Sequence, residues 1–69
     1  MRLTAAVTQE GEWFVARCLQ VEVTSQGESF QESLDNLKEA LELYFEDQPI
    51  PEVMSEPVIA PVDITLRAA

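Results

Sequence analysis

The alternation of apolar and polar residues predicts three strands in the first 25 residues of the chain. Residues 2–8, 13–18 and 21–25 are rich in strand-forming side chains, and the first and third of these segments alternate between apolar and polar positions. The polar residues 9–12 lie between the first two segments and include Gly11, which can adopt the positive φ that a tight turn requires. We therefore expect a β-hairpin followed by a third strand.

A helix pattern follows these strands. Ser29 and Glu32 have the spacing of a capping box, in which the hydroxyl and the carboxylate each accept a hydrogen bond from a free N–H group at the start of the helix. Because Pro49 and Pro51 prevent continuation, we expect the helix to run from about residue 30 to 46 and to span roughly 25 Å. Apolar and small residues at helical spacing form one stripe on it: Phe30, Ser33, Leu34, Leu37, Ala40, Leu41, Tyr44 and Phe45.

A fourth strand is expected near the end of the sequence. After a proline-rich connection over residues 47–57, the segment 58–67 alternates cleanly from Val62 onward, and Pro61 places the start of the strand at a sheet edge because it cannot donate a ladder hydrogen bond. A helix between strands three and four crosses over right-handed and packs on one face of the sheet. The predicted fold is one α+β domain over residues 1–69, with a β-β-β-α-β order. Its four-stranded mixed sheet has the strand order 3-2-1-4, with strand four parallel to strand one.

The sheet face away from the helix is predicted to be an interface. Trp13 and Phe14 are neighbours in one strand, so their side chains point to opposite faces of the sheet. One of them belongs to the core, and the other falls on the uncovered face. A chain of 69 residues buries only about 60% of its unfolded surface. We therefore expect a homo-oligomer, a dimer or a tetramer, formed through the sheet face or an edge strand.

The charge distribution narrows the classes of function. The chain has 13 acidic and 4 basic residues, no histidine and a formal net charge of −9. Residues 22–56 contain ten acids and one base, and 1 − 10 = −9 accounts for the whole net charge. Binding to nucleic acid is not expected, because phosphate contacts need clustered lysine and arginine. No apolar run is long enough for a membrane span.

Candidate chemistry is sparse. The absence of histidine removes the commonest general base and the commonest zinc ligand, and the two glycines form no phosphate-binding loop. Cys18 is the only cysteine and is expected to be a small buried hydrophobe in a protein of the reducing cytoplasm. No catalytic residue, cofactor or metal is therefore expected.

One set of acids has an ordered placement. Five of them fall within roughly 80° of arc on the predicted helix, almost opposite the apolar stripe. We call this set the acidic strip, and Leu43 lies beside it. Two interpretations remain open: a docking surface for a basic partner, and a solvated face that keeps the protein in solution. The hypothesis of a partner-binding site comprises Glu32, Asp35, Glu39, Glu42, Leu43 and Glu46.

The sequence resembles the HicB antitoxin family. The resemblance lies in Gly11, in the strand WFVARC over residues 13–18, and in SQGESFQESLDNLKEALELYFE over residues 25–46. It covers residues 11–46, about half of the chain, and its second part is more specific than a generic amphipathic helix. Packing explains much of that part, but it leaves Asn36, which lies outside the apolar stripe, without an explanation.

The resemblance implies a partial ribonuclease H-like fold without a nuclease site. It further implies an antitoxin that binds and neutralises a small basic HicA-type RNA-cleaving toxin by protein–protein contact. Many members of the family carry a C-terminal DNA-binding domain, but this sequence stops at Ala69, after the predicted fourth strand. Two alternatives stay open. One is a solitary, non-enzymatic oligomeric binding or regulatory domain without a toxin partner, and the other is a degenerate metal-dependent nuclease.

Overall fold

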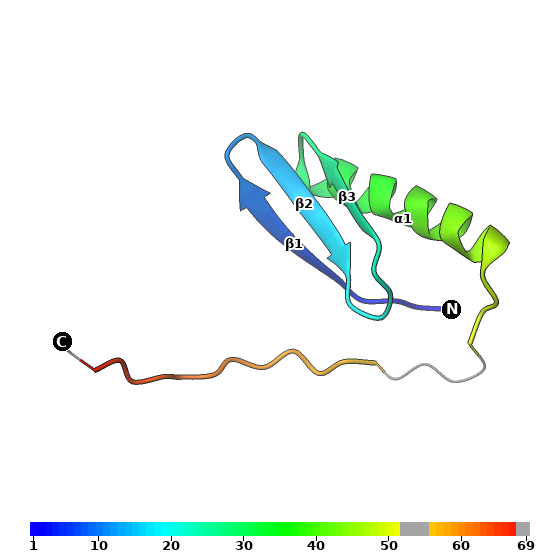
Figure 1. The fold of residues 1–69 in the computed structure, drawn as a ribbon. Coiled ribbons are helices and arrows are strands. Elements are labelled where there is room, and N and C mark those ends of the chain that lie inside the picture. Colours follow the sequence, from blue (N-terminus) through cyan, green and yellow to red (C-terminus); the bar gives the residue numbers. More distant parts are fainter. Residues whose placement is uncertain (52–55, 68–69) are drawn as a thin grey trace.

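The computed structural model describes residues 1–51 and 56–67. Three strands, β1 (Ala5–Glu10), β2 (Trp13–Cys18) and β3 (Thr24–Gly27), precede one helix, α1 (Phe30–Asp47). The strands form an antiparallel sheet in the order β1-β2-β3, and α1 lies across one face of it (Figure 1). The α+β class and the strand order 3-2-1 are therefore confirmed for this part of the prediction.

The β1–β2 hairpin forms at the predicted turn. Glu10 pairs with Trp13 across a two-residue loop, and Gly11 has a φ of 64°. Of the two loop residues, only Gly11 has a positive φ. This combination matches a type II′ turn, whose twist suits a two-residue hairpin. The strand β1 starts later than expected, because Thr4 donates its backbone N–H to the side-chain oxygen of Gln20 at 3.0 Å. It also ends later, because Gln9 and Glu10 continue the pairing with β2 up to the two-residue loop.

The third strand also starts later than expected. Instead of extending from residue 21, the chain turns tightly, with the N–H of Val23 donating to the carbonyl of Val21 at 2.9 Å. The N–H of Cys18 donates to the carbonyl of Val23 at 3.0 Å, which closes the end of the β2–β3 pair. Regular pairing begins at Arg17 and Thr24. Val21 and Val23 therefore pack on the core without joining the ladder, and only residues 24 and 25 of the predicted strand belong to β3.

The core lies between α1 and the sheet. Ala16, Cys18 and Leu37 are its buried apolar residues. Partly buried side chains pack around them: Leu3, Ala5, Val7, Val21, Val23, Leu34 and Leu41. Since Ala16 and Cys18 face the helix, alternation places Phe14 on the same face and Trp13 on the other. Phe14 is half-buried and Trp13 is 45% exposed, but Phe14 is not among the side chains that pack against the buried core, so its assignment to the core stays a prediction.

The start of α1 agrees with the capping box in one of its two bonds. The N–H of Glu32 donates to the hydroxyl of Ser29 at 3.0 Å, as expected. The carboxylate of Glu32 accepts from the N–H of Glu28, one residue before the expected donor, at 3.0 Å. The apolar stripe is predicted to begin at Phe30, but this first helical residue is 54% exposed, so the part of the stripe that packs on the sheet begins later.

The predicted fourth strand is wrong for the described structure. Residues 56–67 are extended and fully exposed, and they pair with no strand (Figure 1). The radius of gyration is 15.1 Å, whereas a compact chain of this length has about 11 Å. An alternating pattern indicates that a segment can form a strand, but it does not indicate which strand that segment pairs with. Pro49 and Pro51 are exposed, and such residues stiffen the chain after the helix. The predicted connection 47–57 lies partly outside the described residues.

Candidate functional site

The acidic strip lies on the exposed side of α1. All five of its carboxylates are exposed, as is Leu43 beside them, with 56% of its surface accessible. Leu37, which faces the sheet, is buried on the opposite side of the helix. The structure therefore brings together all six residues of the predicted site on one solvent-facing surface.

Three members of the acidic strip have local partners. Glu32 takes part in the helix cap, and Asp35 accepts a hydrogen bond from the amide of Gln31 at 2.9 Å. Glu42 lies 3.7 Å from the ammonium group of Lys38, with both side chains largely in solvent. Such an exposed pair contributes between about 0 and 1 kcal/mol. Within residues 1–51 and 56–67, the other two carboxylates of the strip have no hydrogen-bond or ion-pair partner.

The end of α1 concentrates negative charge where the helix itself disfavours it. Glu46 and Asp47 lie in the last turn, which contains no basic residue. The carbonyl groups at the end of a helix carry a partial negative charge, so acids there are unfavourable by about 0.3–1 kcal/mol each. Like charges at the spacings of the acidic strip add a further cost. Stability of the helix therefore does not explain why its exterior is so uniformly acidic.

Asn36 holds α1 to the sheet. Its side-chain amide donates a 2.8 Å hydrogen bond to the carbonyl of Gln26 in β3. This bond explains Asn36, which lies outside the apolar stripe. Helical periodicity does not predict the bond, because the partner of Asn36 lies on β3. Gly27, beside Gln26, is buried against the helix, where a Cβ atom would lie 2.6 Å from the backbone nitrogen of Ser33.

A second feature, missed from the sequence, is an apolar groove between β1 and α1. Its volume is about 400 Å³, and apolar side chains supply most of its lining. Leu3 and Ala5 come from the β1 side, and Leu34, Leu37, Leu41 and Phe45 come from the helix. Helical spacing predicts that these residues of α1 face the core, but it does not indicate where the sheet that covers them ends.

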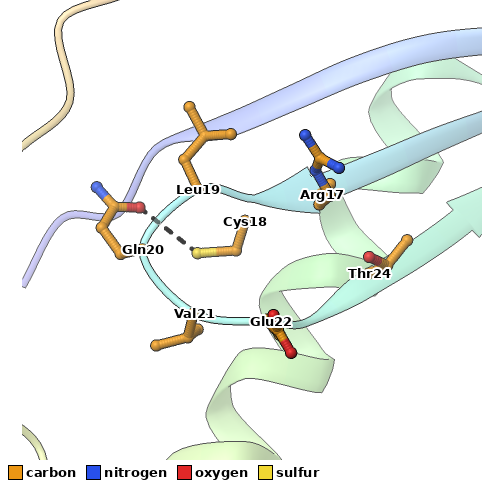
Figure 2. A pocket seen from close by; sticks show the side chains of 7 residues that line it. All are labelled: Arg17, Cys18, Leu19, Gln20, Val21, Glu22 and Thr24. Carbon is orange, nitrogen blue, oxygen red and sulfur yellow. Dashed lines mark hydrogen bonds between the residues drawn. The ribbon is translucent and has the colours of Figure 1, made fainter.

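A third feature is the loop that joins β2 to β3. It surrounds an open pocket of about 590 Å³, into which the thiol of Cys18 points (Figure 2). The side chain of Gln20 is paired within the protein: its oxygen accepts from the thiol at 3.5 Å and from the N–H of Thr4 at 3.0 Å. The amide of Gln20 donates in turn to the Thr4 hydroxyl at 3.1 Å. This network fixes the loop to the N-terminal segment.

Other kinds of site have little support in the described part of the chain. Among residues 1–51 and 56–67, no three cysteine, aspartate or glutamate side chains lie close enough together to hold a metal ion. Within the same residues, no helix is both long and apolar enough to cross a membrane. No protein-family model, curated protein or solved structure matches the chain. The resemblance in residues 11–46 therefore stays a prediction.

Proposed function

We propose that this chain is a HicB-like antitoxin, a non-enzymatic protein that binds and neutralises a small basic RNA-cleaving toxin of the HicA type. The observation that carries the proposal is the acidic strip, which lies fully exposed on α1 within the segment that resembles the family. A toxin that binds RNA needs a basic surface. A rigid helix face with five carboxylates is complementary to such a surface.

The charge of α1 supports association more than stability. The helix contains six acids and one base, a net charge of −5. A concentrated field of this kind accelerates encounter with an oppositely charged partner, and the acceleration decreases as salt increases. Leu43 supplies an exposed apolar group beside the charges, and such a side chain can anchor a contact that charge alone does not fix.

The test uses the small basic protein encoded by an adjacent reading frame, purified as an RNA-cleaving enzyme. The chain is expected to bind it and to stop cleavage of a model RNA at a stoichiometric ratio. Lack of binding, or binding that leaves cleavage unchanged, contradicts the antitoxin role. Without a toxin partner, the solitary binding domain becomes the better description. The chain alone, incubated with RNA and Mg²⁺ or Mn²⁺, is expected to release no fragments, and cleavage by it would identify a nuclease instead.

A charge-reversal pair tests the acidic strip separately. The double variant Glu39→Lys, Glu42→Lys is expected to bind the toxin at least tenfold more weakly at 50 mM salt, with a smaller difference at 300 mM. The matched control is Glu10→Lys, Glu12→Lys at the hairpin, which changes the net charge by the same +4 away from α1. If the two double variants lose equal affinity, net charge and not the strip determines binding.

A further inference from the structure

We infer that residues 62–67 of one chain add to the β1 edge of a second copy and fill its apolar groove, so that two chains form a strand-exchanged dimer. This inference concerns assembly and does not depend on the proposed function. It rests on an unpaired strand edge, an open groove beside that edge, and an exposed apolar segment in the same chain.

The edge of β1 is free to pair. The strand pairs with β2 on one side, and the described part of the chain supplies no partner on the other. An edge strand of six residues presents a row of unpaired N–H and carbonyl groups, which is a template for another strand. β1 has no proline, and its single charged residue, Glu10, lies at its end next to the turn.

The groove lies at the start of the same edge, where Ala5 of β1 and the preceding residues Met1 and Leu3 face α1. Leu34, Leu41 and Phe45 line it from the helix, and each of these side chains is only partly buried. Lys38 and Glu42 lie at its rim and pair with each other in solvent. A fourth strand beside β1 would be covered by these helix residues on one face, as β1 and β2 already are.

The segment after Pro61 has the pattern that such a strand requires. Val62, Ile64 and Leu66 alternate with polar residues and are 72–81% exposed. Successive residues of a strand point to opposite faces, so these three side chains share one face and cover about 13 Å of strand. Within residues 56–67 every residue is exposed, and Val58 and Ile59 add to the apolar surface in water.

A second copy satisfies these features better than the same chain does. In the structure the segment stands away from its own sheet (Figure 1). The groove at the start of β1 is open. Each chain thus presents both a segment with the pattern of a strand and an unpaired edge that could accept it. Two chains related by a twofold axis can exchange their segments, which pairs both edges and fills both grooves without leaving a free strand.

The mass of the full chain in solution gives the first test. Light scattering across 1–100 µM is expected to show a dimer of twice 7.7 kDa, which is 15.4 kDa. Ile64→Asp is expected to reduce the association constant at least tenfold. Thr65→Asp, on the polar side of the same segment, changes it less than threefold. A monomer throughout this range overturns the inference, as does an equal response of the two variants. Circular dichroism confirms that both variants remain folded.

A mixed-isotope sample identifies the occupant of the groove. Equal amounts of labelled and unlabelled chain are unfolded together, refolded and examined by isotope-filtered nuclear Overhauser spectra. Contacts between chains, from residues 62–66 of one to residues 5–9 and Leu41 of the other, are expected. If these contacts occur only within a chain, the segment closes on its own sheet and the inference is wrong. If the chains contact each other only through Trp13, the dimer uses the uncovered face instead.

Discussion

Replacing Gly27 by alanine tests the close contact between β3 and α1. A Cβ atom at this position would lie 2.6 Å from the backbone nitrogen of Ser33 and 2.9 Å from the Cβ of Glu32. The first of these atoms belongs to the helix backbone and cannot move like a side chain, so the helix must shift away from the strand. Its φ is not positive, so the cost arises from packing alone.

Two opposing contributions determine the change in the free energy of unfolding caused by Gly27→Ala. Insertion of a methyl group into a tight contact costs typically about 1–3 kcal/mol. The alanine also restricts the unfolded chain, which returns about 0.4–1 kcal/mol. We expect Gly27→Ala to lower the free energy of unfolding by about 1–2 kcal/mol. With a urea dependence of roughly 1 kcal/mol per M, the midpoint decreases by about 1–2 M.

Urea unfolding, followed by circular dichroism and by the fluorescence of Trp13, measures this change at one fixed protein concentration. The control is Gln26→Ala, the neighbouring exposed residue of β3, which is expected to change the free energy of unfolding by less than about 0.5 kcal/mol. A Gly27→Ala protein as stable as the wild type would refute the argument that Gly27 is required for close approach of the helix.

Three further substitutions test other contacts of α1 by the same measurement. Ser29→Ala removes the N-terminal cap and is expected to cost about 1 kcal/mol, whereas Ser29→Asp retains an acceptor and stability close to the wild type; equal losses would exclude the cap. Asn36→Asp replaces the donor to the Gln26 carbonyl by an acceptor, and a loss of about 0.5–1.5 kcal/mol is expected; no loss would mean that the bond does not hold the helix. Leu37→Ala removes a buried side chain at a cost of about 2–5 kcal/mol, whereas Leu43→Ala on the exposed side costs less than about 0.5 kcal/mol; similar losses would contradict the assigned faces.

The local features of the fold were predictable from short-range chemistry. Gly11 marks a turn because few other residues adopt its positive φ, and Ser29 marks a helix start because its hydroxyl can accept a free N–H. The exposure of the acidic strip follows from helical periodicity alone. Each of these predictions depends on residues within a few positions of one another, where the sequence determines the geometry directly.

The features that were missed depend on contacts between elements. The amide of Asn36 finds its partner ten residues earlier, on β3, and no spacing rule indicates that carbonyl. The start of β3 depends on the turn that the N–H of Val23 closes on the carbonyl of Val21, and on the hydrogen bond from Cys18 to Val23. The segment after Pro61 has the composition of a strand, but composition does not show whether an edge of its own sheet is within reach.

The two edges of the sheet differ in whether they can be extended. On one side, β3 has four residues, and one of them, Gln26, already accepts a hydrogen bond from the helix. On the other side, β1 has six residues and lies beside an open apolar groove. A sheet that grows from both edges can propagate into a fibre, whereas growth from one edge ends after a single addition. The hydrogen bond from Asn36 occupies one backbone acceptor of β3, which makes that edge a poorer template than β1 for a further strand.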